Sequence, residues 1–316
     1  MEPGPTRLAT LAIALSIGSA WSAAAGEASE DALPPLDRLL DRLARVAEVY
    51  DGSALRFTAE EVTKVKNYLG GTTTPPTMHL VNVYSYYRDE NGVLNDRRIR
   101  QSAARSLVRA TSMEEIVRIA DAAGDPMSEH AGLKGDHGVP AFLSRPYSWI
   151  LLFSHTSQER YEYSVEQASR PDSVRIHFRP ARDASAVDWY GSAVIDIGDM
   201  QVVRAEGLQH EDHAAQQALL RMLEAPGDLP LSVEDRTFFV RRISTDFGTE
   251  MHGLRLPSRV EIVVERHRVV GLAGNKRQKT TTAARIDQSY RNYRFYDIDL
   301  TTDFNPRRAA PESGSP

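Results

Sequence analysis

The sequence predicts an α+β fold with a mostly antiparallel sheet. Roughly nine or ten segments have the alternation or the β-branched and aromatic content of strands, whereas about three have the apolar stripe of a helix. Hairpin-type turns join many of these strands, most clearly at Asn91-Gly92. The helices are isolated among runs of strands instead of alternating with them, as parallel βαβ units would require.

The first residues have the order of a secretory leader. Arg7 precedes an apolar run over residues 8–21, and small residues follow at 22–26. The run is shorter than the roughly 20 residues that span a bilayer. We therefore expect residues 1–25 to be a signal peptide, no transmembrane segment after its cleavage, and a periplasmic or secreted protein.

The composition limits what can hold the rest of the chain together and what it can bind. There is no cysteine, so an ordinary hydrophobic core must hold the exported chain together. The formal net charge is -5 with both signs mixed, which argues against nucleic acid as a partner. We expect a flexible N-terminus at 26–33, a single domain at 34–304 and a disordered tail at 305–316.

The predicted elements of the first half include two helices. Leu39, Leu43 and Val46 share one side of a helix over 36–50 that opens after Pro34. A strand is expected over 55–65, a hairpin over 78–88 and 93–100, and a second helix over 113–120, where a capping box precedes Ile116. The apolar stretch 140–153 fits either a helix or a strand.

The second half is dominated by strands. They are expected at residues 160–165, 172–180, 188–197, 200–208, 237–245, 256–268 and 278–290, the last continuing into 293–300. One helix interrupts them at 212–224 and ends at Ala225-Pro226-Gly227.

The segment 288–299, QSYRNYRFYDID, concentrates aromatic rings near the end of the chain. If it is a regular strand, Tyr290 and Tyr296 lie on one face, and Tyr293 and Phe295 lie on the other. This division argues against a single aromatic platform. We expect Tyr293 and Phe295 to face the helices.

Two polar clusters admit a functional and a structural interpretation. His210 and His213 flank Glu211-Asp212 and could ligate zinc, although a metal site needs further ligands and Asp212 is a natural helix cap. The basic segment 266–279 could bind phosphate groups, but its charges are also typical of a solvated hairpin tip. The structural interpretation is favoured in both cases, so we expect no metal and no cofactor.

Nucleophilic catalysis has little support in the sequence. There is no Gly-x-Ser-x-Gly elbow, no cysteine, and no Ser-x-x-Lys with recognisable partners. We therefore expect a protein that is not an enzyme, with a metal-dependent hydrolase at His210 and His213 as the remaining catalytic alternative.

Three segments, at residues 190–206, 253–262 and 288–295, together carry a resemblance. The first segment has a glycine, a strand ending in Asp, a turn, and a second strand that contains an arginine. The second segment has Leu256-Pro257 before Val260. The third has Tyr290, Tyr293 and Phe295 with arginines between them. This order resembles the outer-membrane lipoprotein-sorting superfamily, the LolA and LolB carriers with the RseB sensor domain, and in particular its larger bacterial members. The resemblance covers roughly residues 185–300.

The resemblance implies a strongly curved antiparallel sheet, a half-barrel, wrapped around a few helices. It also implies a cavity between sheet and helices for an apolar or amphipathic ligand, such as a lipid or the acyl chains of a lipoprotein. The residues we expect to line that cavity are Leu39, Leu43, Val46, Ile116, Tyr293 and Phe295. The alternative is a sensor or interaction module that docks another envelope protein.

Overall fold

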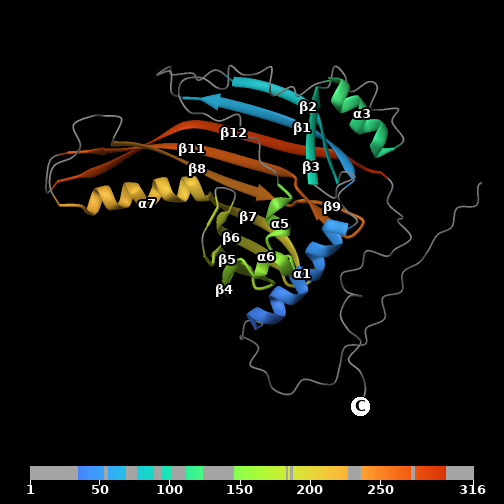
Figure 1. Cartoon of the computed structure of the whole chain (residues 1–316), viewed down its shortest axis with the longest axis horizontal. Coiled ribbons are helices and arrows are strands. Elements are labelled where there is room, and N and C mark those ends of the chain that lie inside the picture. Colours follow the sequence, from blue (N-terminus) through green and yellow to red (C-terminus); the bar gives the residue numbers. More distant parts are fainter. Residues whose placement is uncertain are drawn as a thin grey trace, which may run out of the picture. The chain divides into compact units, whose positions relative to one another are not determined.

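Figure 1 shows the computed structural model of the chain. It describes residues 35–52, 56–68, 77–88, 94–100, 112–123, 146–182, 184–185, 188–226, 236–271 and 275–296. The expected signal peptide, the N-terminal segment 26–33, the tail 305–316 and the end of the last predicted strand, 297–300, lie outside these residues. Contacts separate residues 1–33 from residues 34–316, so every described element belongs to the second unit. No helix in the described ranges is long and apolar enough to cross a membrane.

Ten antiparallel strands form the main sheet. They are β1 (Phe57–Asn67), β2 (Thr77–Arg88), β3 (Leu94–Arg100), β4 (Tyr161–Gln167), β5 (Ser173–Pro180), β6 (Trp189–Asp196), β7 (Gln201–Gln209), β8 (Thr237–Asp246), β11 (Arg259–Val270) and β12 (Arg277–Phe295). Their order is β3-β2-β1-β12-β11-β8-β7-β6-β5-β4, which leaves β3 and β4 at the edges of the described sheet. This topology confirms the predicted α+β class, the antiparallel sheet and the β2–β3 hairpin.

The described helices are α1 (Leu36–Gly52), α3 (Met113–Ala123), α5 (Ser148–Leu151), α6 (His155–Gln158) and α7 (His210–Glu224). Pro35 precedes α1 and its carbonyl accepts from the amide of Leu39 at 3.2 Å. Ser112 Oγ accepts from the amide of Glu115 at 3.3 Å, as the predicted capping box requires. The end of the ambiguous stretch 140–153 proves helical at α5.

The sequence predicted only a loop at Gly253, but the structure has a short second hairpin there. It joins β9 (Thr249–Met251) to β10 (Leu254–Leu256). His252 and Gly253 form its two-residue turn, with φ of 53° and 78°. Two consecutive left-handed residues fit the twist of the flanking strands.

The core lies on one face of the sheet, which we call the inner face. Alternate residues of the strands bury there, among them Ile176 and Phe178 of β5 and Ile262 of β11. Helix α1 packs against α5 and α6, and α6 packs against β4. Two polar contacts tie helices to strands, since Trp149 Nε1 donates to Thr245 Oγ1 at 2.9 Å and Tyr50 donates to Gln201 Oε1 at 3.0 Å.

Strand β12 departs from the regular alternation that the sequence predicted. Asn292 has a φ of 57°, and the pairing with β1 shifts so that Glu60 faces Arg291 while Thr58 faces Arg294. The extra residue is a β-bulge, which turns the strand and resets its alternation. Tyr290 and Tyr293 are therefore both buried, and the predicted placement of Tyr290 opposite Tyr293 and Phe295 is wrong.

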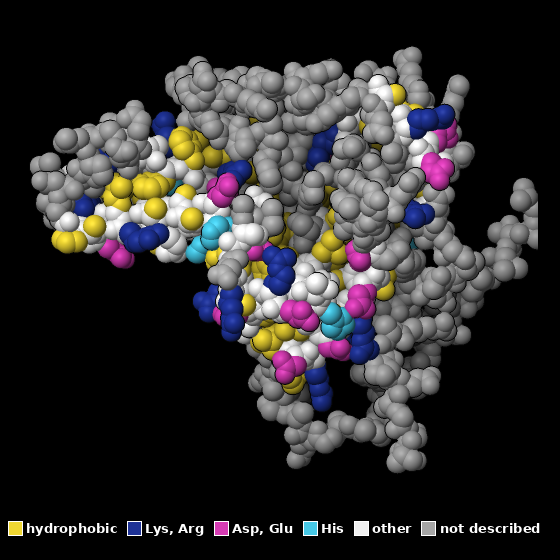
Figure 2. Space-filling model, viewed as in Figure 1, with side chains coloured by type: hydrophobic (Ala, Val, Ile, Leu, Met, Phe, Trp, Pro, Cys, Tyr) yellow, Lys and Arg dark blue, Asp and Glu magenta, His cyan; other side chains and the backbone are white. Residues whose placement is uncertain are grey.

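Helix α7 lies beside the end of β8 that β7 does not pair. The β7–β8 pairing ends at Gly207 and Ile243. Beyond it, the amide of Arg241 donates to Asp212 Oδ1 at 2.9 Å, and its guanidinium binds the same carboxylate. Leu219 of α7 packs with Met222, Leu223, Phe238 and Val269. Figure 2 shows hydrophobic side chains gathered over this part of the molecule.

Candidate functional site

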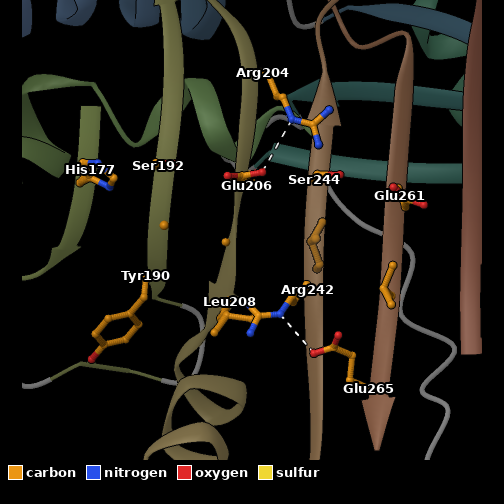
Figure 3. Close-up of a pocket in the computed structure, with 14 residues that line it drawn as sticks. His177, Tyr190, Ser192, Arg204, Glu206, Leu208, Arg242, Ser244, Glu261 and Glu265 are labelled. Carbon is orange, nitrogen blue, oxygen red and sulfur yellow. Dashed lines mark hydrogen bonds and ion pairs between the residues drawn. The ribbon is translucent and has the colours of Figure 1, made fainter. Parts of the chain in front are cut away.

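A groove of about 510 Å³ lies across five strands, β5, β6, β7, β8 and β11. Most of its side chains belong to the face opposite the core, which we call the outer face (Figure 3). The residues that line it are His177, Tyr190, Gly191, Ser192, Arg204, Glu206, Gly207, Leu208, Arg242, Ile243, Ser244, Glu261, Val263 and Glu265. We call this site the outer groove.

Strand alternation explains why the outer groove is mostly polar. Cross-strand neighbours share a face, so Ser192, Glu206 and Ser244 stand in one row across β6, β7 and β8. The residues between them, such as Ala193, Ala205 and Ile243, are buried in the core. Leu208 and Val263 add apolar surface to the outer groove.

Two glycines let β6 and β7 approach closely beneath the groove. Gly191 and Gly207 face each other across the two strands. A Cβ at Gly191 would lie 2.1 Å from the carbonyl oxygen of Glu206, and one at Gly207 would lie 2.5 Å from that of Tyr190. The Cβ at Gly207 would also come within 3.2 Å of the Trp149 ring. Neither position therefore accommodates a side chain without movement of the backbone.

The arginines of the outer groove are already paired with carboxylates. Arg204 binds Asp246 at 2.7 Å and lies 3.7 Å from Glu206, while Arg242 lies 3.3 Å from Glu265. Figure 3 shows the Arg204–Glu206 pair within β7 and the Arg242–Glu265 pair between β8 and β11. The groove thus presents donors and acceptors of both signs instead of a field of one sign.

Ser192 and His177 are the groove residues that most resemble a nucleophile and its base. They face each other across β6 and β5. No hydrogen bond joins these two described side chains; instead, Arg175 donates to Ser192 Oγ at 3.0 Å and Glu166 lies 3.2 Å from His177 Nε2. A base must reach the nucleophile's proton, and this arrangement does not provide that contact.

His210 and His213 lie close to the outer groove, around Tyr190. The His213 ring stacks on Tyr190 with centroids 3.7 Å apart, and Tyr190 Oη lies 3.4 Å from His210 Nδ1. Burial, followed by the neighbouring His210, lowers the pKa of His213 below its ordinary value. Within the described residues, no three metal-ligating side chains come together, so the two histidines have no third ligand there.

The six residues predicted to line an inner cavity do not line the outer groove. Leu39, Leu43 and Val46 are buried on α1, and Ile116 is buried on α3. Tyr293 is buried, Phe295 is half-buried, and both contact the Phe57 ring. All six are therefore buried or half-buried, and their role in binding stays a prediction.

An aromatic cluster fills the inner face around the β12 bulge. Phe57 lies at its centre, with its ring centroid 4.9 Å from that of Tyr147 and 5.4 Å from that of Tyr293. The remaining members are Tyr84, Tyr86, Tyr290 and Phe295. Burial raises the pKa of the Tyr147 and Tyr293 hydroxyls well above the ordinary value, so both stay neutral. Three of the four rings of the segment 288–299 therefore belong to one cluster.

A buried ion pair lies beside this cluster. Glu61 is fully buried, and Arg98 donates from Nε to both of its oxygens at 3.0 and 3.1 Å. Gln288 Nε2 donates to Glu61 Oε2 at 3.1 Å. The buried atoms Tyr147 Oη, Tyr290 Oη and Gln288 Oε1 have no hydrogen-bond partner in the described structure. Such atoms are costly unless a ligand or water satisfies them.

Comparisons with known proteins give weak structural similarities, two of which are described. No family model matches the chain, and no curated protein matches it. A DUF1329 family protein from Desulfovibrio piger is 12% identical with a TM-score of 0.34, covering 83% of this chain and 94% of that one. A structure of the MucA/MucB complex of Pseudomonas aeruginosa is 9% identical with a TM-score of 0.21, covering 82% and 99%. Scores this low show neither a family nor a function for this chain.

Proposed function

We propose that this chain is an exported, non-enzymatic binding or carrier protein for an amphipathic ligand. The outer groove is the observation that supports this proposal. Its volume of about 510 Å³ falls within the roughly 300–1,000 Å³ of small-molecule sites. It also combines apolar Leu208 and Val263 with charged and hydroxyl side chains, the mixed lining that an amphipathic ligand needs.

The charge pairing of the groove favours a neutral or zwitterionic polar group on the ligand. Arg204 and Arg242 are each compensated by protein carboxylates, so a simple anion would have to compete with Asp246 and Glu265. A ligand with both donors and acceptors can instead join the network without displacing a pair.

The non-enzymatic part of the proposal depends on the contacts of Ser192. Its oxygen accepts from Arg175 and has no bond to His177, although both side chains are described. The purified protein should therefore release no more product from p-nitrophenyl acetate than a Ser192→Ala variant does. Hydrolysis by the parent that the variant lacks would contradict this part.

Filling the outer groove tests the binding proposal directly. Val263→Trp and Ser244→Trp place a large ring in the groove, whereas Val62→Trp places it on β1, outside the groove. Fluorescent lysophosphatidylcholine should bind the parent and Val62→Trp, and its affinity should fall at least tenfold in both groove variants. Equal binding by all four proteins would remove the outer groove as the site.

The inner face is a second candidate for the ligand, within the half-barrel of the lipoprotein-sorting superfamily that the sequence resembles. Three buried atoms without a partner among the described residues, Tyr147 Oη, Gln288 Oε1 and Tyr290 Oη, favour it, because a bound polar head could satisfy them. The ligand's apolar part would then contact Leu39, Leu43, Val46, Ile116, Tyr293 and Phe295. Binding that survives both groove variants, together with lipid that copurifies with the protein, would support this location.

A protein-docking role is the alternative to a carrier. Strand β4 pairs only with β5 among the described strands, so its other edge offers backbone groups to an extended segment of an envelope protein. Glu162 and Glu166 of this strand already pair with Arg179 and Arg175, so such a partner would bind mainly through the backbone groups of the edge. Crosslinking of the exported protein in cells should then give one dominant protein adduct, and a lipid carrier without a partner should not.

A metal-dependent hydrolase at His210 and His213 is the least supported alternative. It would need ligands beyond the two rings, and Tyr190 stacks on one of them. Elemental analysis of protein purified without chelators should find no stoichiometric zinc; one bound zinc per chain, lost in His213→Phe, would revive this alternative.

A further inference from the structure

One end of the sheet combines exposed apolar side chains with cations that pair with no carboxylate among the described residues. It is formed by β8, β11 and β12, which are neighbours in the sheet. Phe239 faces Arg266, Arg268 faces Lys279, and Val270 faces Arg277 across these strands. Positions 266, 268 and 270 alternate along β11, so these six residues share one face of the strands, which we call the basic face.

The opposite side of the same strands is already covered. Phe238 and Val269 alternate with the residues of the basic face and pack with Leu219 of α7. His267 is buried on that side and bonds Thr280 at 3.0 Å. The basic face therefore has no helix α7 over it. Phe239 is 36% exposed and Val270 is 38% exposed, while Arg277 and Lys279 are exposed.

The charge of this end differs from that of the whole chain. Residues 266–285 contain six cations and no Asp or Glu, although the formal net charge of the chain is -5. The six are Arg266, Arg268, Lys276, Arg277, Lys279 and Arg285. Among the described residues, no carboxylate pairs with Arg266, Arg268, Arg277 or Lys279, in contrast to the paired arginines of the outer groove. In addition, the buried Nε of Arg266 has no hydrogen-bond partner in the part of the chain that the structure describes.

We infer that the basic face docks on an anionic lipid surface. Cations near such a surface are attracted to its phosphates, and an aromatic or aliphatic side chain among them enters the boundary of the acyl region. A soluble polyanion would bind the cations, but it would not bury the apolar side chains of Phe239 and Val270. The inference goes beyond the proposed ligand site, because docking on a membrane does not require an occupied outer groove.

Vesicle cosedimentation of the full exported chain tests this inference. The parent should bind phosphatidylcholine vesicles that contain phosphatidylglycerol, bind pure phosphatidylcholine weakly, and lose most of its binding at high salt. Arg277→Gln with Lys279→Gln should weaken binding roughly 30-fold, from about 1 kcal/mol per cation near the surface. Phe239→Ser should weaken the binding that remains at high salt.

Matched controls separate this surface from general effects. Arg56→Gln with Arg170→Gln removes two exposed arginines outside the basic face and should leave vesicle binding within twofold of the parent. Circular dichroism should show that every variant is folded. Equal binding to neutral and anionic vesicles, equal loss in the control pair, or binding to heparin without binding to vesicles would overturn the inference. Lysophosphatidylcholine binding should persist in Arg277→Gln with Lys279→Gln, so failure of docking and failure of the ligand site are distinguishable.

Discussion

The two faces of the sheet differ in how far their charged side chains are buried, although both faces are built from the same sheet. On the inner face, Glu61 is fully buried against Arg98, whose side chain is 8% exposed. On the outer face, Glu206 is 47% exposed and is shared between Arg175 and Arg204. A buried pair is expensive to break, while exposed pairs contribute little to stability and can rearrange. The inner pair therefore stabilises one arrangement of the core, and the outer pairs are free to respond to a ligand.

The two faces should differ most in the free energy of unfolding that is lost when one carboxylate is removed from each face. Glu61→Gln removes the carboxylate charge that binds buried Arg98 and should lower the free energy of unfolding by roughly 3–5 kcal/mol. Glu162→Gln breaks the exposed pair with Arg179 and should cost about 0–1 kcal/mol. Urea denaturation of both variants measures this, and equal losses would contradict the comparison.

A substitution at Gly207, where β6 and β7 approach closely under the groove, should have the next largest effect on stability. In Gly207→Ala the new Cβ meets the Tyr190 carbonyl and the Trp149 ring, so the two faces are disturbed together. We expect a loss of about 1–3 kcal/mol, typical of overpacking, and weaker lysophosphatidylcholine binding. Gly198→Ala, where the nearest atom belongs to the Asp196 side chain, should stay within about 0.5 kcal/mol in thermal unfolding. A Gly207→Ala variant as stable as the parent would show that the strands separate freely.

Two buried tyrosines of the inner face should respond in opposite directions to loss of the hydroxyl. The Tyr50 hydroxyl donates its one hydrogen between the Arg255 carbonyl and Gln201 Oε1, so Tyr50→Phe should lose about 1–3 kcal/mol. The Tyr147 hydroxyl has no partner in the described structure, so Tyr147→Phe should be neutral or more stable by about 1 kcal/mol. Urea midpoints measure both. A destabilised Tyr147→Phe would mean that water or a ligand satisfies this hydroxyl, which would strengthen the inner-face candidate.

Most of the elements could be predicted from the sequence because their patterns are local. The alternation of β5 and β6, the apolar stripe of α1 and the Ser112 cap of α3 each depend on residues close in the chain. The bulge at Asn292 could not be predicted in this way. It inserts one residue against β1, which lies more than 200 positions earlier, and only this pairing brings Tyr290 to the side of Tyr293.

The outer groove was missed for a related reason. Its residues come from five strands and are individually ordinary, since Arg204, Glu206 and Ser244 look like any solvent-facing positions. The usable signal was the pair Gly191 and Gly207, which interrupt two neighbouring predicted strands. A glycine inside a strand marks a close backbone approach, and two that face each other locate it.

The smallest predicted effect is a pH dependence at the boundary of the outer groove. His213 stacks on Tyr190 with His210 beside it, and burial together with His210 holds its pKa below 6.5. The native state therefore binds fewer protons at this site than the unfolded state does, and stability falls as the pH drops below 6.5. His213→Phe keeps a ring against Tyr190 but cannot titrate, so its stability relative to the parent should rise as the pH falls from about 7 to about 5. Thermal unfolding across that range measures the difference, and His79→Phe controls for the loss of an exposed imidazole. Parallel stability curves for parent and His213→Phe would show that protonation at this boundary is not linked to folding.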